Sequence, residues 1–425
     1  MANPWSSDNP DGVLMHEQIA EFFHKQVQLL PADHLTYSIG PRGSLRLRGA
    51  LAAILNDKFH ARVTVTPNDL CVTPGLASCI DSVAWATCNP NDIILVPTPY
   101  YSGFTVHVTH RSGVKLVGVD YSDIPGYSGL DDLFLPEINT KALEAAVEKA
   151  KQNGLTVGAL MITQPNNPLG RCYPPETMKA FLAFCSRHQI HLISDEIYAQ
   201  SVYQNPDMPN ATPFTSVLSL DWQGVIDPVM VHVMWGASKD FCANGLRLGM
   251  LYTKNKGVLG SISSNGQFAW SPHVMQDVWA AMLEDREWLE AFFAKNHELM
   301  ARNYAIAASF FREHQIEYSE SNAGLFMWID LRRFLLPKSL RDKAEYGDLK
   351  GTSLKADTYR AREARVAAIC MENKVFVSPG ALYAASEYGW FRITFTLAED
   401  ALREGLRRIT AEIAFFLLPL LPYHF

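Results

Sequence analysis

The sequence predicts an α/β fold, with a mostly parallel sheet between helices and a second, smaller domain. Three observations predict it: short apolar runs that end in polar turns, helical patterns that alternate with these runs, and a length of 425 residues. A chain of this length exceeds the size at which one hydrophobic core stops growing. Alternating strands and helices are typical of a parallel sheet with helices on both faces.

The predicted strands are continuous apolar runs. Residues 93–96, 157–162 and 190–194 are almost wholly apolar and end in polar or proline-rich turns, as strands buried on both faces do. A further apolar run, 229–233, precedes Lys239. We therefore expect a sheet that is covered on both sides.

The predicted helices lie between these runs, at 78–87, 140–153 and 174–188. The last of them opens with Pro174-Pro175-Glu176, and proline is favoured in the first turn of a helix. A long helical pattern over 271–313 is expected to lead from the large domain into the second one.

From these elements we divide the chain into three parts. Residues 1–44 are expected to pack with the small domain, 45–290 to form the large domain, and 291–425 the small α+β domain. The charged segment 337–362 is expected to be an exposed excursion. The apolar run 414–422 contains two prolines and is well short of the roughly 20 residues of a membrane helix, so we expect a tail packed on the body or on a partner subunit.

Composition favours small-molecule chemistry over nucleic-acid or membrane binding. The net charge is -7, with 48% hydrophobic and 19% charged residues, and no basic cluster marks a nucleic-acid surface. The seven cysteines are scattered and form no Cys-x-x-Cys pair, which indicates reduced, mostly buried thiols and no metal site. The N-terminus lacks the pattern of a signal peptide, so a cytoplasmic location is expected.

Three short motifs each follow an apolar run: Asn-Asn-Pro-Leu-Gly at 166–170, Asp-Glu-Ile-Tyr at 195–198, and Ser-Lys at 238–239. In open α/β sheets, ligands bind at the carboxyl ends of the strands. Segments that are distant in the sequence are therefore expected to surround one crevice.

The residue types in these motifs fit the requirements of pyridoxal 5'-phosphate. Lys239 can form the Schiff base, and Asp195 can keep the pyridine nitrogen protonated. Asn167 and Tyr198 can donate to the ring oxygen, and Arg247 can neutralise the phosphate. Partial burial after an apolar strand would lower the pKa of Lys239 and favour the neutral nucleophile, whereas most lysines are solvated surface charges.

Other residues have a functional and a structural interpretation. Asp195 alone could be a helix N-cap or part of an ion pair. The turn 74–78, with Ser238, could bind phosphate through free backbone N–H groups, or could be a structural turn. Tyr101 could stack on the pyridine or pack in the core. Arg392, within an apolar stretch, needs a partner, either a substrate carboxylate or a buried acid.

These motifs, in this order, resemble those of the class I aminotransferase superfamily, the pyridoxal-phosphate enzymes of fold type I. The likeness is greater to the 1-aminocyclopropane-1-carboxylate synthase branch, including its fungal synthase-like proteins. It extends over 97–101, 322–328, 378–380 and 390–392, and so covers almost the whole chain. The resemblance implies a homodimer with active sites at the subunit boundary.

The resemblance also implies a role for each candidate residue. These roles are Lys239 as the Schiff-base lysine, Asp195 on the pyridine nitrogen, Asn167 and Tyr198 on the 3-oxygen, Tyr101 stacked on the ring, Ser238 and Arg247 with the turn Leu76, Ala77 and Ser78 on the phosphate, Tyr37 from the dimer mate near the phosphate, and Arg392 on the substrate carboxylate.

The sequence departs from the family pattern at three places. Gly236 stands where a second phosphate-binding serine is usual, and Leu76-Ala77 replace an Ala-Thr pair. The third departure is larger: a Leu-Gly-x-Ala-Glu-Asn segment that lines the substrate site in this branch is missing, because 9–12 is followed almost directly by 14–17.

The expected activity is that of a pyridoxal-phosphate lyase or aminotransferase on an amino acid or an S-adenosylmethionine-like substrate. The leading hypothesis is Cα deprotonation followed by elimination at Cβ or Cγ, either synthase-like or as carbon-sulfur cleavage. Transamination by the same residues is the rival, since both reactions begin with removal of the Cα proton. From another class, a cofactor-binding protein with an impaired substrate site is the alternative that the missing segment motivates.

Overall fold

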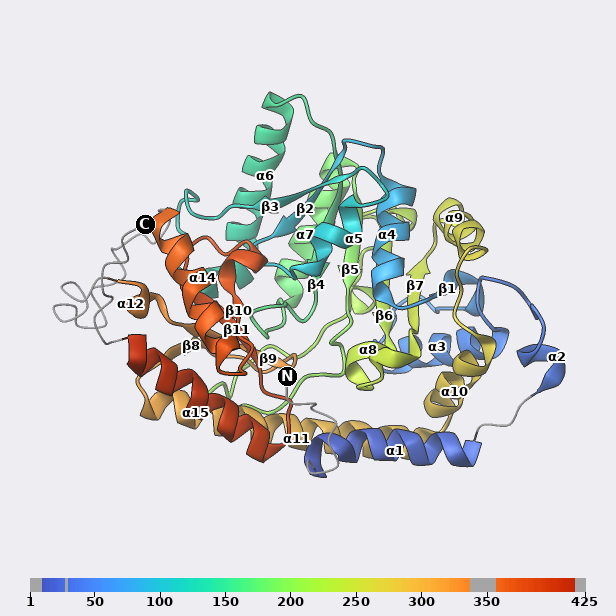
Figure 1. Ribbon diagram of the computed structural model, residues 1–425. Helices are drawn as coiled ribbons and strands as arrows, with labels where there is room; N and C mark the ends of the chain where they lie inside the picture. The colour runs from blue at the N-terminus through green and yellow to red at the C-terminus, as the bar shows by residue number, and fades with distance from the viewer. Residues whose placement is uncertain (1–9, 27–29, 337–356, 417–425) are drawn as a thin grey trace.

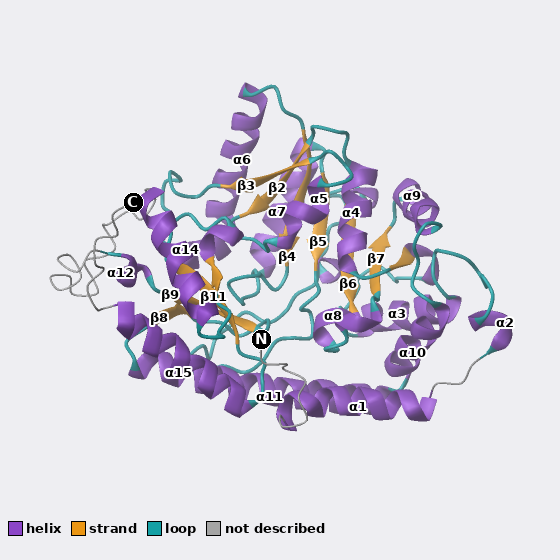
Figure 2. Cartoon of the chain, viewed as in Figure 1, coloured by secondary structure: helices purple, strands orange, loops and turns teal. Residues whose placement is uncertain are grey.

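The computed structural model describes residues 10–26, 30–336 and 357–416, which form two sheets with surrounding helices (Figures 1 and 2). The larger sheet has seven strands in the order β1-β7-β6-β5-β4-β2-β3. The strands are β1 (Leu70–Thr73), β2 (Ile93–Pro97), β3 (Lys115–Val119), β4 (Val157–Thr163), β5 (His191–Asp195), β6 (Val231–Gly236) and β7 (Gly249–Thr253). Pairing is parallel except along β7, which is antiparallel to both of its neighbours. The predicted mostly parallel sheet is confirmed.

The central strands are apolar throughout because both faces of the sheet are buried. Leu160, Leu192 and Val233 belong to one core cluster, whereas Met161 and Ile193 belong to a cluster on the opposite face. Successive side chains of a strand point to opposite faces, so each strand supplies both cores. Continuous hydrophobicity in the sequence therefore reflects burial on two sides.

Helices cover the two faces of the large sheet (Figure 1). One core cluster includes residues of α4 (Leu76–Thr87), α5 (Gly103–Thr109) and α9 (Lys256–Gly266). The other includes residues of α3 (Leu45–Asp57), α6 (Pro136–Gln152), α7 (Pro175–His188), α10 (His273–Glu284) and α11 (Arg286–Glu313). The short α2 (Pro31–His34) and α8 (Ala237–Asp240) complete this part of the chain.

The long helical pattern predicted over 271–313 is divided into two helices. Asp285 ends α10 and caps α11, because its side chain accepts a hydrogen bond from the backbone N–H of Trp288. An aspartate in this position satisfies an N–H group that has no partner within the helix. Periodicity alone did not reveal this break, since apolar residues continue at helical spacing on both sides of it.

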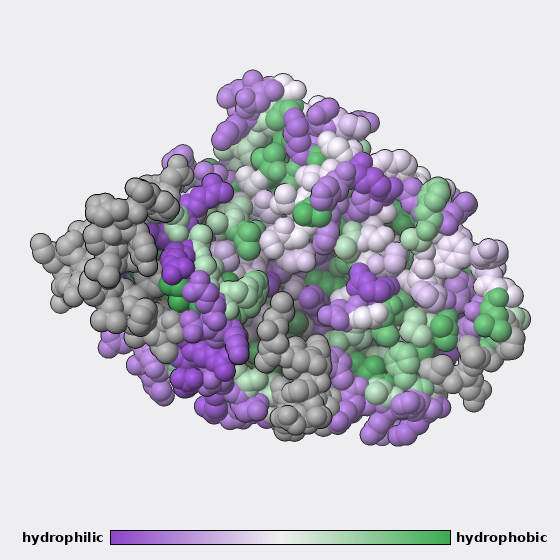
Figure 3. Space-filling view, viewed as in Figure 1, coloured by the Kyte–Doolittle hydropathy of each residue, from purple (hydrophilic) through white to green (hydrophobic). Residues whose placement is uncertain are grey.

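The second unit contains a four-stranded antiparallel sheet in the order β10-β11-β9-β8. Its strands are β8 (Glu317–Ser319), β9 (Phe326–Asp330), β10 (Ser378–Pro379) and β11 (Trp390–Thr394). Its core also includes residues of α11, α12 (Arg332–Leu335), α14 (Asp357–Glu372) and α15 (Glu399–Phe416). Figure 3 shows hydrophilic side chains over α15. On this helix, Glu404 forms ion pairs with Arg407 and Arg408.

The N-terminal helix α1 (Pro10–Gln26) packs along two helices of the chain, and the expected packing of 1–44 with the small domain stays a prediction. It contacts α10 and α11, and Met15, Ile19 and Phe22 belong to the core cluster of the larger sheet. These three residues recur at helical spacing and give α1 an apolar side. The domain boundaries at 44/45 and 290/291 stay a prediction. Residues 337–356 and 417–425, which include most of the predicted excursion and most of the apolar tail, lie outside the described residues.

None of the helices in the described part of the chain is long and apolar enough to cross a membrane.

A buried histidine pair at the amino ends of the central strands predicts acid sensitivity. His232 is fully buried, with Nδ1 2.9 Å from Thr253 Oγ1 and Nε2 2.9 Å from Nδ1 of His191. Burial, and then the neighbouring His191, lower the pKa of His232 to about 3. The unfolded chain binds the proton with the ordinary histidine pKa near 6.5, so stability falls as the pH drops below that value.

We expect the low pKa of His232 to lower the free energy of unfolding by about 2 kcal/mol when the pH falls from 7 to 5. In His232→Gln, which cannot take up a proton, the loss of stability over this range should be smaller by about that amount. Urea unfolding at pH 7 and pH 5 measures the difference. An equal loss in both proteins would contradict the assignment.

Candidate active site

A cavity of about 170 Å³ lies at the carboxyl edge of the large sheet, where the three sequence motifs meet. It is lined by Leu76, Ala77, Ile80, Tyr101, His107, Thr163, Asn167, Asp195, Ile197, Tyr198, Ser238, Lys239, Asn244 and Arg247. In the sheet, Thr163 pairs with Asp195 and Asp195 with Met234, so β4 and β5 end at the same level and β6 continues to Gly236, two residues beyond it. The predicted convergence of the motifs is therefore observed.

Asp195 is the last residue of β5, and its carboxyl group is buried. One oxygen accepts a hydrogen bond of 3.1 Å from the backbone N–H of Ile197. Burial raises the pKa of Asp195 to about 7, against the opposing effects of that hydrogen bond and of Lys239. Within the described residues Asp195 has no ion-pair partner, so the alternative of a structural salt bridge receives no support. A cationic ligand atom would relieve this cost of burial.

Lys239 lies in α8, directly after β6. Burial is the main cause of a lowered pKa for Lys239; the cation of Arg392 lowers it further, and Asp195 opposes the shift. A lowered pKa increases the fraction of neutral amine, the form that attacks a carbonyl carbon. The environment thus favours a nucleophilic lysine over a solvated surface charge.

Asn167, Tyr198 and Arg392 form a connected group across the crevice. Asn167 Nδ2 lies 3.4 Å from the hydroxyl oxygen of Tyr198, and Arg392 Nη1 donates to Asn167 Oδ1 at 3.1 Å. Tyr198 is buried, and burial raises its pKa, so it remains a neutral donor at ordinary pH. β11 of the small sheet therefore places its arginine next to a residue that follows β4 of the large one.

Arg392 has a hydrogen-bond donor that is available to a ligand. Its Nε is buried and has no hydrogen-bond partner within the described residues, and its guanidinium lies 5.0 Å from the ring centres of both Phe326 and Tyr383. No carboxylate of the described part pairs with it, so the alternative of a buried salt bridge is not observed. A carboxylate ligand would satisfy the free donor.

The turn before α4 lies against the guanidinium of Arg247. Gly75 has φ +81°, and a side chain there would collide with the guanidinium of Arg247, so glycine permits this close approach. The helix begins at Leu76, and the first N–H groups of a helix have no partner within it. Leu76, Ala77, Ser238 and Arg247 all line the cavity, whereas Ser78 is not among its lining residues.

Close packing explains why position 236 is a glycine, and the sequence alone did not reveal this. A β-carbon at position 236 would lie 2.7 Å from the carbonyl oxygen of Leu248 and 2.9 Å from Cδ1 of Leu76. The backbone of Leu248 and Gly249, where β7 begins, thus occupies the space that a serine side chain would require. The glycine is needed for close packing, and the hydroxyl that is usual there in the family has no room here.

Tyr101 lines the cavity, and its ring centre lies 5.4 Å from that of Phe104 and 6.1 Å from that of His107. Both of the interpretations that the sequence left open therefore have contacts in the structure, since the ring packs on α5 and also lines the cavity. Burial raises the pKa of Tyr101, and Asp195 adds to that shift.

Tyr37 does not line the cavity. Its side chain is 80% exposed and contacts the ring of Trp270 at 5.9 Å. The structure describes one chain, so a role from a dimer mate stays a prediction.

Sequence reasoning missed five lining residues: Ile80, His107, Thr163, Ile197 and Asn244. Ile197 follows Asp195 by two residues, and the turn after β5 returns its side chain to the same cavity. His107 Nδ1 is buried without a hydrogen-bond partner in the described part of the chain. Position within the motif could have suggested Ile197, whereas no local signal marked His107.

The donor set fits pyridoxal phosphate. A buried acid, a desolvated lysine, an amide with a phenol, and an arginine at a helix N-terminus are all available around one cavity, and the unpartnered Arg392 Nε is ready for a substrate anion. By contrast, the described residues form no cluster of His, Cys, Asp or Glu that could hold a metal ion.

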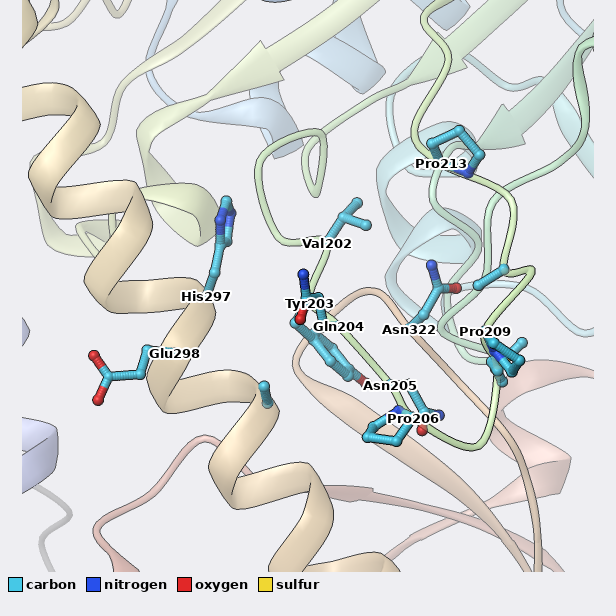
Figure 4. Close-up of a pocket in the computed structure, with 13 residues that line it drawn as sticks. Val202, Tyr203, Gln204, Asn205, Pro206, Pro209, Pro213, His297, Glu298 and Asn322 are labelled. Atoms are coloured by element: carbon cyan, nitrogen blue, oxygen red, sulfur yellow. The ribbon is translucent and has the colours of Figure 1, made fainter.

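A larger and more open cavity, of about 850 Å³, lies away from these residues (Figure 4). It is formed by α11 residues such as His297 and Glu298 on one side and by the loop around Pro206 and Pro209 on the other. His297 is held by a 2.6 Å hydrogen bond with the carbonyl oxygen of Gln200. None of the predicted site residues lines this cavity, so volume alone does not locate the chemistry.

Comparisons with known proteins agree with this geometry. The family model "Aminotransferase class I and II" matches residues 4–409. The mouse "1-aminocyclopropane-1-carboxylate synthase-like protein 1" is 32% identical over 369 residues, which cover 87% of this chain and 68% of the mouse protein. The "Probable aminotransferase aclI" of Aspergillus oryzae is 31% identical over 383 residues, covering 89% of this chain and 83% of that protein.

Solved structures share the fold at lower sequence identity. The aromatic aminotransferase from Pyrococcus horikoshii superimposes with a TM-score of 0.71 and 19% identity, over 95% of this chain and 92% of that one. At this identity the likeness bears on the fold alone.

Proposed function

Because the chain belongs to the class I and II aminotransferase family and is a pyridoxal-phosphate-dependent enzyme, we propose that it deprotonates Cα of an α-amino acid and then eliminates a group at Cβ or Cγ. The observation that carries the proposal is the convergence of Lys239, Asp195 and Asn167 on one cavity, with Arg392 hydrogen-bonded to Asn167. The cofactor, when bound, supplies a covalent link to an amine and an electron sink for negative charge at Cα.

We propose these roles for the residues of the site. Lys239 binds the cofactor covalently and, once released as a neutral amine, removes the Cα proton. The buried carboxylate of Asp195 holds a proton on the pyridine nitrogen. Asn167 and Tyr198 donate to the ring oxygen, Tyr101 and Ile197 enclose the ring, and the helix N-terminus with Ser238 and Arg247 binds the phosphate.

Elimination and transamination share these first steps and differ in the fate of the proton. Relatives bear names of both kinds, one a synthase-like protein and one a probable aminotransferase. We place elimination first because the sequence likeness to the synthase branch extends along almost the whole chain. Transamination remains the second candidate, since nothing around Lys239 excludes it.

The experiment incubates purified holoenzyme with a panel of amino acids, with and without a 2-oxo acid, and identifies products by mass. Without an added 2-oxo acid, elimination is expected to release a leaving group such as a thiol together with either a cyclic amino acid, or, after hydrolysis by water, a 2-oxo acid and ammonia. Rapid exchange of amino groups with the added 2-oxo acid would replace this proposal with transamination. If no amino acid shifts the cofactor absorbance, the substrate site is impaired.

Arg392 is proposed to bind the substrate α-carboxylate. In Arg392→Lys the bidentate contact is lost while one positive charge remains, so KM is expected to rise about 10- to 100-fold with a smaller change in kcat. Steady-state kinetics with the best substrate measure this. Cofactor content should stay at the wild-type level. A KM within twofold of wild type would remove Arg392 from the carboxylate site.

We also propose a homodimer, supported by an exposed apolar surface near Tyr37. The side chains of Leu35, Tyr37 and Phe268 are 72%, 80% and 92% exposed, and the two segments meet where Tyr37 contacts Trp270. An apolar surface of this kind is typical of a subunit contact. Sedimentation should give twice the 47.5 kDa chain mass for wild type and one chain for Phe268→Glu. The control Val225→Glu, at another exposed apolar residue, should remain dimeric; a monomeric wild type would contradict the proposal.

A reducing compartment such as the cytoplasm is proposed from the thiols. Six of the seven cysteines, Cys71, Cys79, Cys88, Cys172, Cys185 and Cys242, form no disulfide in the structure, and five of the seven are buried. Alkylation in denaturant without prior reduction should modify all seven. A mass short of seven adducts would indicate oxidised cysteines and a different compartment.

A further inference from the structure

A second cavity, of about 280 Å³, adjoins the first at Lys239 and shares three lining residues with it. Ser238, Lys239 and Asn244 line both cavities. The remaining walls come from α1, Cys242, the middle of α11, Leu325 before β9, Thr394 at the end of β11, and the residues 396–398 that follow it. In the view of Figure 1, α1 and α11 run side by side below α8. A group in this cavity is therefore within reach of the reacting lysine.

The walls of the second cavity are largely apolar. Six lining side chains are hydrophobic: Met15, Leu299, Met300, Leu325, Leu397 and Ala398. Its volume is well above the roughly 10–15 Å³ that a single water requires, so it can hold a chain of several methylene groups. Burial of such a chain against aliphatic and thioether side chains is favourable.

Charge in the cavity disfavours a cationic ligand. Its described lining contains Lys239, His16 and Arg302 but no aspartate or glutamate. A sulfonium or ammonium group placed here would lose its hydration without gaining a counter-charge. The lining therefore favours an uncharged side chain over that of S-adenosylmethionine or of a basic amino acid.

One buried amide supplies a specific polar contact. Asn296 is 5% exposed, and its Nδ2 has no hydrogen-bond partner in the described residues. A buried donor without a partner is costly, and native proteins usually satisfy it. An oxygen acceptor on the ligand would do so.

We propose that this second cavity binds the substrate's side chain, and that the substrate is an α-amino acid with an uncharged chain about four non-hydrogen atoms long, in which a thioether sulfur bonded to Cβ or Cγ is the leaving atom and the far end carries an oxygen acceptor for Asn296. This rests on the proposed function, since Lys239 must first take part in binding the amino acid. The other polar residues that line the cavity then lie beside the substrate's side chain, and the end of that side chain lies against α11.

The test uses equilibrium binding to the holoenzyme, followed by the visible absorbance of the cofactor. The probes are α-methyl amino acids, which have no Cα proton and cannot be turned over: α-methylalanine, α-methylnorleucine, its 6-hydroxy form, and α-methyllysine. Each buried methylene is worth about fourfold in affinity. We expect α-methylnorleucine to bind at least tenfold tighter than α-methylalanine, the 6-hydroxy form tightest of all, and α-methyllysine no better than α-methylalanine.

Two variants locate the side chain. Ala398→Phe fills the cavity and should weaken α-methylnorleucine at least tenfold, with α-methylalanine changed less than threefold. Asn296→Leu should abolish the preference for the 6-hydroxy form over α-methylnorleucine. Ala145→Phe, on the exposed side of α6, is the matched control and should alter neither constant. Circular dichroism and melting temperature establish that each variant folds; if Ala398→Phe does not fold, Asn296→Leu with the wild-type probe series decides the matter.

The outcomes separate this inference from the proposed function. If α-methylalanine and every other probe fail to shift the absorbance of wild type, the proposed function itself fails. If α-methylalanine shifts it but the longer probes bind no tighter, or if α-methyllysine binds tightest, the cavity is not the side-chain site. Equal weakening of long and short probes by Ala398→Phe would likewise overturn the inference.

Discussion

Lys239→Ala is expected to reduce turnover at least about 10⁴-fold, equivalent to about 5.5 kcal/mol of transition-state stabilisation. The reason is that one amine serves both as the covalent attachment of the cofactor and as the base at Cα. The measurement pairs initial rates with borohydride reduction: wild type should retain the cofactor after reduction and denaturation, whereas the variant should release it.

A matched control separates the loss of the specific role of Lys239 from any general effect of removing a lysine. Lys179 lies exposed on α7, and Lys179→Ala should keep both wild-type activity and reducible absorbance. If Lys239→Ala retained the reducible absorbance, another amine would hold the cofactor and the role of Lys239 would be wrong. Lys239→Arg, which keeps the charge but is not nucleophilic, should be as inactive as the alanine variant.

The sheet and its active edge could be predicted from the sequence because the relevant signals are local. Residues 157–162 and 190–194 are apolar without alternation, which requires burial on both faces, and polar motifs follow immediately. Parallel strands place their carboxyl ends at one edge, so Asn167, Asp195 and Lys239 had to converge. Each of these inferences needs only a strand, its end and the residue that follows.

The parts that could not be predicted depend on packing between distant segments. The partner of Arg392 is Asn167, 225 positions earlier in the chain, and no pattern near either residue indicates the other. The apolar side of α1 packs on α10 and α11, but an apolar side of this kind could equally have covered the small sheet. The sequence of α1 therefore did not indicate which surface it contacts. Glycine at 236 could be interpreted as a lost ligand, but the approach of Leu248 that requires it exists only in three dimensions.

Asp195→Asn is expected to lower kcat about 10³-fold, or about 4 kcal/mol, with KM changed less than about threefold. In the protein without cofactor, burial holds the pKa of this acid near 7, so the carboxylate is poorly stabilised until a cation faces it. A protonated pyridine nitrogen is such a cation, and the pair stabilises the ring form that accepts electrons from Cα. An amide cannot hold that proton, so the cofactor should still bind to Lys239 while Cα deprotonation slows. Exchange of the substrate Cα proton with deuterated solvent measures this step apart from product release. Asp195→Glu, which keeps the acid at a shifted position, should recover part of the rate. An asparagine variant within tenfold of wild type would mean that the ring nitrogen is held in another way and that the burial of Asp195 is structural.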